Sequence, residues 1–97
     1  MAEILTAEAF APHVGKCLHP QGQHRVLTLV SMNIDDRPDV EFAGRKPFTL
    51  RLRGAPGDVL PEGIYHVVID DGPAFDLYII PIHTMSREHQ DYQVVVN

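Results

Sequence analysis

Hydrophobic and polar residues alternate along much of this chain, most clearly between residues 48 and 53. The apolar positions of that segment are Phe48, Leu50 and Leu52, and the polar positions are Thr49, Arg51 and Arg53. Successive side chains of a β-strand point to opposite faces, so a period of two is typical of a strand with one buried face. The pattern therefore predicts a strand whose apolar face packs on a core and whose other face carries two arginines.

Five further strands are predicted, at residues 16–19, 24–34, 64–70, 75–82 and 92–97. The segment 24–34 has apolar residues on both faces near Val26–Val30, which is typical of a strand covered on both sides. Its length predicts a bend or a bulge. Asp71-Gly72-Pro73 predicts a tight hairpin connection, and Pro81 indicates an edge or the end of a strand.

A short helix is predicted at the N-terminal end of the chain. Thr6 is a favourable N-cap, and Pro12 ends the helix near Ala11 because its ring would clash with a preceding carbonyl. A helix of about two turns is not stable alone. We therefore expect it to dock on the sheet through Leu5, Phe10 and Val14.

The order of these elements predicts a mostly β protein in one domain, residues 1–97. We expect a small antiparallel barrel or sandwich of five to six strands with one short N-terminal helix, because such chains hide their strand edges. A partly open barrel is the favoured form, with the helix at one end or on one side. At 97 residues, a single core is the expected outcome.

Charge and cysteine content narrow the classes of function. The chain has 8 Lys and Arg against 13 Asp and Glu, a formal net charge of −5, and one cysteine. One cysteine excludes a monomer built on disulfides, and a reducing, cytoplasmic setting is expected. The first ten residues do not resemble a signal peptide, and no run of about 20 apolar residues predicts a membrane span.

Half of the basic residues lie close together in sequence, and they raise the possibility of nucleic-acid binding. They are Arg45, Lys46, Arg51 and Arg53. Arg51 and Arg53 lie about 7 Å apart on one strand face, a spacing that suits neighbouring phosphates. The competing interpretation is a solvated face whose arginines pair with Asp70, Asp76 or Glu62. The acidic balance favours the competing interpretation.

Six histidines and Cys17 are the candidate residues for metal binding or catalysis. The histidines are His13, His19, His24, His66, His83 and His89. Zinc sites usually show closely spaced ligand pairs, and here the only near pair is Cys17 with His19. We therefore expect no metal ligands, no catalytic residues and no cofactor. A small metal-binding protein or a hydrolase that uses Cys17 or a histidine remains a second alternative.

Several stretches resemble a small bacterial family of unknown function. They are "LTAEAFAPHVGK", "FTLRLRG", "VLPEGIYHV", "FDLYIIPI" and "YQVVVN". The family pattern is Phe-x-Leu-x-Phe-Arg-Gly, then Leu-Pro-x-Gly-x-Tyr, then a C-terminal Tyr-x-x-x-x-Asn. Leu52 replaces the second aromatic residue here, and residues 70–74 lack the usual His-Pro. Members are sometimes encoded beside phage-tail-like components, so the resemblance implies a role in structure or assembly.

The element order is also similar to the Sm-like fold of RNA-binding rings, although the nucleotide-pocket motifs of that fold are absent. Together these observations lead us to expect a non-catalytic protein–protein interaction module, a homodimer or a larger ring. Exposed strand edges in a short chain motivate this expectation. The predicted C-terminal strand, with Tyr92, Val94 and Val96 on one face, is the expected pairing edge.

Overall fold

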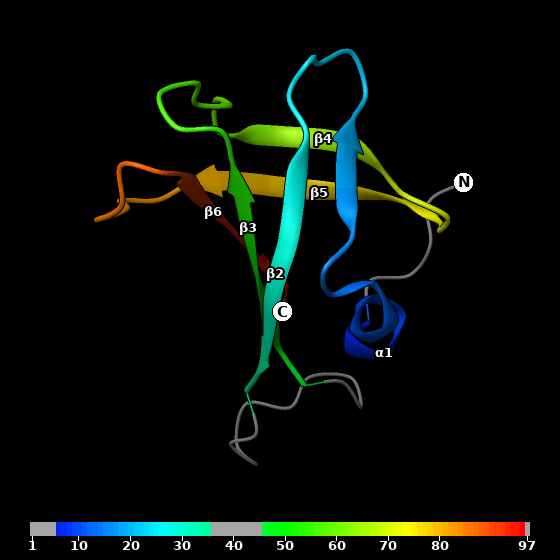
Figure 1. The fold of residues 1–97 in the computed structure, drawn as a ribbon. Coiled ribbons are helices and arrows are strands. Elements are labelled where there is room, and N and C mark those ends of the chain that lie inside the picture. The colour runs from blue at the N-terminus through cyan, green and yellow to red at the C-terminus, as the bar shows by residue number, and fades with distance from the viewer. Residues whose placement is uncertain (1–5, 36–45, 97) are drawn as a thin grey trace.

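The computed structural model describes residues 6–35 and 46–96. Its six strands form one closed antiparallel barrel in the order β1-β2-β3-β6-β5-β4 (Figure 1). The strands are β1 (Cys17–Pro20), β2 (Leu27–Ile34), β3 (Phe48–Gly54), β4 (Gly63–Ile69), β5 (Ala74–Pro81) and β6 (Gln90–Val96). The expected mostly β fold is therefore confirmed. Of the alternatives left open, the barrel is the correct one, and it is closed rather than partly open.

The N-terminal helix begins where the sequence predicts. The Thr6 hydroxyl accepts a hydrogen bond from the Ala9 backbone N–H at 3.2 Å, and helix α1 (Ala7–Phe10) continues into the 3₁₀ turn η1 (Ala11–His13). Phe10 is fully buried, with its ring centre 4.3 Å from that of Phe75 and 5.8 Å from that of Phe48. This aromatic contact joins the short helix to β3 and β5. Leu5 lies outside the described residues, and Val14 is exposed instead of docked.

The strand predicted at residues 24–34 is shorter in the structure, where β2 covers Leu27–Ile34, and it carries the expected bulge. In β2 the register with β3 shifts between Leu29 and Ser31, which brings Met32 onto the core side. Val26 lies before the strand and is exposed, so the expectation that the segment is covered on both sides at Val26 is wrong. The bulge explains the misleading pattern, because it exchanges the inward and outward positions halfway along the strand.

The core is built from alternate residues of the strands, as the period of two predicts. Phe48, Leu50 and Leu52 of β3 are buried, while Arg51 and Arg53 face outward. The β4–β5 hairpin turns at residues 70–73, and Asp71 adopts a positive φ of 54° there. Asp tolerates this left-handed conformation better than most residues do.

The C-terminal strand corrects the expectation of a free edge. β6 pairs with β3 from Phe48↔Val96 to Gly54↔Gln90, and with β5 at Ile80↔Gln93 and Pro81↔Tyr92. Tyr92, Val94 and Val96 point into the core and are buried. Closing the barrel requires this strand to have a neighbour on each side. These three side chains therefore do not form an outer surface.

Candidate functional site

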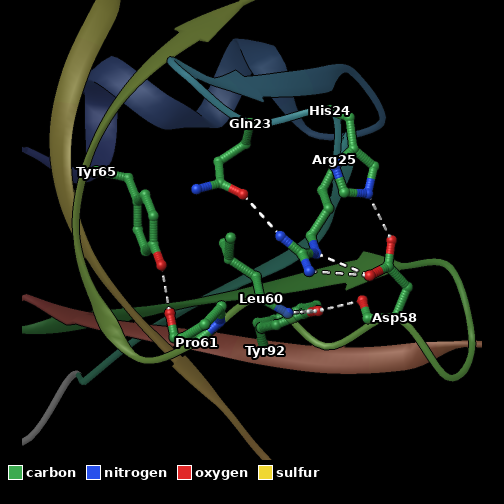
Figure 2. A network of polar contacts seen from close by, with 8 residues as sticks. All are labelled: Gln23, His24, Arg25, Asp58, Leu60, Pro61, Tyr65 and Tyr92. Carbon is green, nitrogen blue, oxygen red and sulfur yellow. Dashed lines mark hydrogen bonds and ion pairs between the residues drawn. The ribbon is translucent and has the colours of Figure 1, made fainter.

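A hollow opens between the connection that leads from β1 to β2 and the loop between β3 and β4. Its volume is about 310 Å³, and its lining residues are His24, Arg25, Val26, Leu27, Ala55, Asp58 and Tyr92. Figure 2 shows the polar groups of this region and the hydrogen bonds between them. Segments far apart in the sequence meet here, so the hollow is a product of the fold.

Four side chains form a polar clamp across the hollow, which we call the Arg25–Asp58 clamp and define as Gln23, His24, Arg25 and Asp58. Nε and NH2 of Arg25 each lie 3.0 Å from Oδ1 of Asp58, and NH1 donates to the Gln23 side-chain oxygen at 2.7 Å. Nε2 of His24 lies 3.0 Å from the second carboxylate oxygen, Oδ2 (Figure 2). The clamp ties the two loops together.

The clamp also fixes the charge of the carboxylate. The hydrogen bond from His24 lowers the pKa of Asp58, and the positive charge of Arg25 adds to this effect against the opposing effect of desolvation. Asp58 is therefore ionised at neutral pH, where it neutralises Arg25. His24 is 74% exposed, so it stands at the rim of the hollow.

Two tyrosine hydroxyls hold the loop that follows the clamp. The Tyr92 hydroxyl accepts a hydrogen bond from the Leu60 backbone N–H at 2.8 Å and donates to the Asp58 carbonyl at 3.4 Å. The Tyr65 hydroxyl donates to the Pro61 carbonyl at 2.6 Å (Figure 2). The stretch Leu-Pro-x-Gly-x-Tyr at residues 60–65 thus acts through backbone positioning, with Tyr92 as its partner from β6.

The chain belongs to the family described as domain of unknown function DUF6916. The family model matches residues 5–96. Searches of curated proteins and of solved structures returned no significant match. The membership agrees with the resemblance to a small family of unknown function, and within this DUF6916 domain the residues of the Leu-Pro-x-Gly-x-Tyr stretch serve the fold.

Arg51 and Arg53, on the outer face of β3 in this DUF6916 domain, lie beside an acid that was not predicted as their partner from the sequence. Nε of Arg53 donates to Oδ1 of Asp91 at 3.1 Å, and NH1 of Arg51 lies 3.9 Å from Oδ2. Asp91 is 7% exposed and also lies 3.4 Å from Nε2 of His89. Both arginines thus lie beside an acid, as the competing interpretation expected, but the acid is Asp91 and not Asp70, Asp76 or Glu62. Arg45 lies outside the described residues, and Lys46 is exposed.

The three acids expected beside the arginines have other partners. Asp70 bonds His19 at 2.6 Å, Asp76 bonds His66 at 2.8 Å, and Glu62 accepts a hydrogen bond from the Tyr78 hydroxyl. That hydrogen bond raises the pKa of Tyr78 above its usual value. Register explains the second of these pairs, because His66 lies directly opposite Asp76 in the β4–β5 ladder.

The histidines are dispersed over the barrel. Four of them pair with four different aspartates: His19 with Asp70, His24 with Asp58, His66 with Asp76 and His89 with Asp91. Among residues 6–35 and 46–96, no three His, Cys, Asp or Glu side chains converge as a metal site would require. Cys17 is half-buried in β1, opposite Thr28. Sequence spacing alone could not have revealed the three pairs whose members are 10, 34 and 51 residues apart, whereas His89 and Asp91 are near neighbours in the chain.

An apolar pair stands on the outside of the barrel. Ile64 of β4 is 73% exposed and Tyr78 of β5 is 46% exposed, and the two residues lie directly opposite each other in the ladder. The pair His66 and Asp76 follows at the next outward position of the same two strands. We call this surface the Ile64 face and define it as Ile64, Tyr78, His66 and Asp76.

In the part of the chain that the structure describes, no helix is both long enough and apolar enough to cross a membrane.

Proposed function

We propose that this DUF6916 domain is a non-catalytic protein–protein interaction module that assembles with a second copy of itself through the Ile64 face. The observation that carries the proposal is the exposure of Ile64 and Tyr78 side by side on the outer surface. Adjacent exposed apolar side chains ringed by polar groups are typical of contact surfaces between proteins.

The strand edge beside Ile64 supports the same surface. β1 pairs with β4 at Val67–Ile69, and the last contact along that side is the hydrogen bond from the Gln21 N–H to the His66 carbonyl, 2.8 Å. Within the described residues, no strand pairs with that side of Gly63–Tyr65. An unpaired edge of this kind is a template for pairing with another chain.

A second copy fits the polar groups of this face. Nδ1 of His66 and Oδ1 of Asp76 lie side by side, 2.8 Å apart. In a two-fold dimer the same patch meets itself, so each histidine can approach the acid of the other copy. An assembly role also agrees with the resemblance to a family whose members are sometimes encoded beside phage-tail-like components.

Light scattering after size-exclusion chromatography, over a series of protein concentrations, tests the proposal. We expect the mass to rise from monomer toward dimer with concentration, and Ile64→Lys to shift this rise to at least about tenfold higher concentration, since a lysine on an edge opposes pairing. Val14→Lys is the matched control, because Val14 is also exposed but lies before β1. A strict monomer at high concentration, or an equal effect of both substitutions, would refute the proposal.

A further inference from the structure

The hollow at the Arg25–Asp58 clamp has the properties of a preformed binding site. Its volume of about 310 Å³ falls at the lower end of the range for small-ligand pockets, about 300–1,000 Å³. Four of its seven lining residues are apolar or aromatic: Val26 and Ala55 are exposed, whereas Leu27 and Tyr92 are buried. This lining suits the apolar body of a small ligand.

The floor of the hollow is held in place before any ligand arrives. The ring of Tyr92 is fully buried, and its hydroxyl is fixed by the Leu60 N–H and the Asp58 carbonyl. Gly54 passes so close that an added Cβ would lie 2.8 Å from Cδ2 of Leu27 and 3.4 Å from Cε1 of Tyr92. A rigid floor lowers the entropic cost of ordering a site on binding.

The spare hydrogen-bonding capacity at the rim includes N–H donors of Arg25. A guanidinium group has five N–H donors, and the contacts of Arg25 to Asp58 and Gln23 use three of them. On Asp58, Oδ1 contacts Nε and NH2 of Arg25, and Oδ2 lies 3.0 Å from Nε2 of His24. The Arg25 side chain is 22% exposed, and it lines the hollow.

We propose that this hollow binds a small carboxylate with an apolar body. The carboxylate accepts hydrogen bonds from the remaining N–H groups of Arg25, and the apolar body lies on the exposed lining residues Val26 and Ala55. Arginine is well suited to this role because its planar donors match the geometry of a carboxylate. The site is independent of self-association, because its residues do not belong to the Ile64 face.

A titration with phenylacetate, followed by NMR of the ¹⁵N-labelled protein, tests the proposal. We expect saturable shifts of the Arg25 Nε–H and of the Ala55 and Leu60 backbone N–H at up to about 20 mM, well above a millimolar dissociation constant. Phenylacetamide keeps the ring but lacks the charge, and we expect it to bind at least about tenfold more weakly, as loss of a charge-assisted hydrogen bond predicts.

Two variants separate binding from folding. Arg25→Gln should abolish the phenylacetate shifts, but it also breaks the clamp. Ala55→Phe fills the hollow from an exposed position and leaves the clamp intact, so it should abolish binding without loss of the folded spectrum. Arg51→Gln is the control, since Arg51 also lies near an aspartate, at 3.9 Å from Asp91, but on the outer face of β3.

The carboxylate can come from a free organic acid or from the C-terminus of another chain, and a second pair of probes distinguishes these sources. A tetrapeptide that ends in phenylalanine is compared with phenylacetate, and its C-terminal amide serves as the control. If each acid binds more tightly than its amide, the proposed site is supported, and whichever acid binds more tightly shows whether the carboxylate comes from a C-terminus or from a free organic acid. Shifts that do not saturate, that are equal for acid and amide, or that persist in Ala55→Phe would overturn the proposal.

Discussion

Asp91 is a buried carboxylate whose pKa is set by the residues around it. Burial alone would raise the pKa of Asp91, but the hydrogen bond from Arg53, the charges of His89 and Arg53 and the hydrogen bond from Thr84 outweigh it. The pKa of Asp91 therefore lies below its usual value. Buried charges are tolerated in proteins when they are paired and hydrogen-bonded in this way.

This lowered pKa predicts the acid sensitivity of the domain. Because the folded state holds its proton less tightly than the unfolded state, the stabilisation by Asp91 is present above the ordinary value of 3.8 and is lost as the pH falls below it. We expect Asp91→Asn to flatten this fall in the free energy of unfolding. Near neutral pH the same variant should be less stable by about 1–3 kcal/mol.

Urea unfolding at a series of pH values measures both effects. Asp76→Asn is the matched control, because Asp76 also pairs with a histidine but is largely exposed. An Asp91→Asn variant with the same acid transition as the parent protein would contradict the role given to this carboxylate.

Gly72 lies so close to His13 that there is little room for a side chain. A Cβ added there would lie 3.0 Å from Cε1 of His13 and 3.3 Å from its Nδ1, a buried nitrogen without a hydrogen-bond partner among the described residues. We expect Gly72→Ala to destabilise the domain by about 1 kcal/mol through overpacking. In a His13→Ala background this cost should largely disappear, and a double-mutant cycle in urea measures the difference. Equal costs in both backgrounds would mean that His13 is not the obstacle.

At the scale of the elements, β6 and the loop between β3 and β4 depend on each other. Leu60 is fully buried, and its backbone N–H has the Tyr92 hydroxyl as its partner. A buried donor that loses its partner costs about 1–3 kcal/mol. The loop therefore keeps its conformation because a strand 32 residues later supplies a hydroxyl.

Removing that hydroxyl gives a direct prediction. We expect Tyr92→Phe to destabilise the domain by about 1–3 kcal/mol and to speed hydrogen exchange at the Leu60 N–H. Tyr65→Phe removes the hydroxyl that donates to the Pro61 carbonyl at an exposed site, so its effect should be smaller. Urea unfolding together with NMR-detected exchange compares the two. A larger effect of Tyr65→Phe would contradict this assignment.

For the whole molecule, the negative net charge and the ion pairs of the arginines both disfavour binding to nucleic acid. The chain carries a net charge of −5, and Arg51 and Arg53 both face Asp91. Binding to nucleic acid depends on positive charge that is available to phosphates. The pairing leaves little such charge on the outer face of β3.

We therefore expect no binding of single-stranded RNA or DNA oligonucleotides at about 0.15 M salt, as the charge balance predicts. Fluorescence anisotropy with labelled oligonucleotides measures this. The opposite result would be an affinity that falls steeply with salt and that is lost when Arg51→Ala and Arg53→Ala are combined. That result would favour the nucleic-acid alternative.

The sequence by itself determined the local structure of this protein. The period of two predicted the inward residues of β3, the Thr6 cap predicted the start of α1, and Asp71-Gly72-Pro73 predicted the β4–β5 hairpin. These features depend on residues close together in the chain. The bulge in β2 escaped detailed prediction, because a single extra residue reverses the faces without a distinctive sequence signal.

Only the tertiary structure decided which distant residues meet. Closure of the barrel buried Tyr92, Val94 and Val96, and it paired β6 with β3 from Gln90 to Val96 and with β5 at Tyr92 and Gln93. The same closure paired Arg53 with Asp91 and Arg25 with Asp58, across 38 and 33 residues. Such contacts depend on strand order and register, and neither of these is encoded in a local pattern of hydrophobic and polar residues.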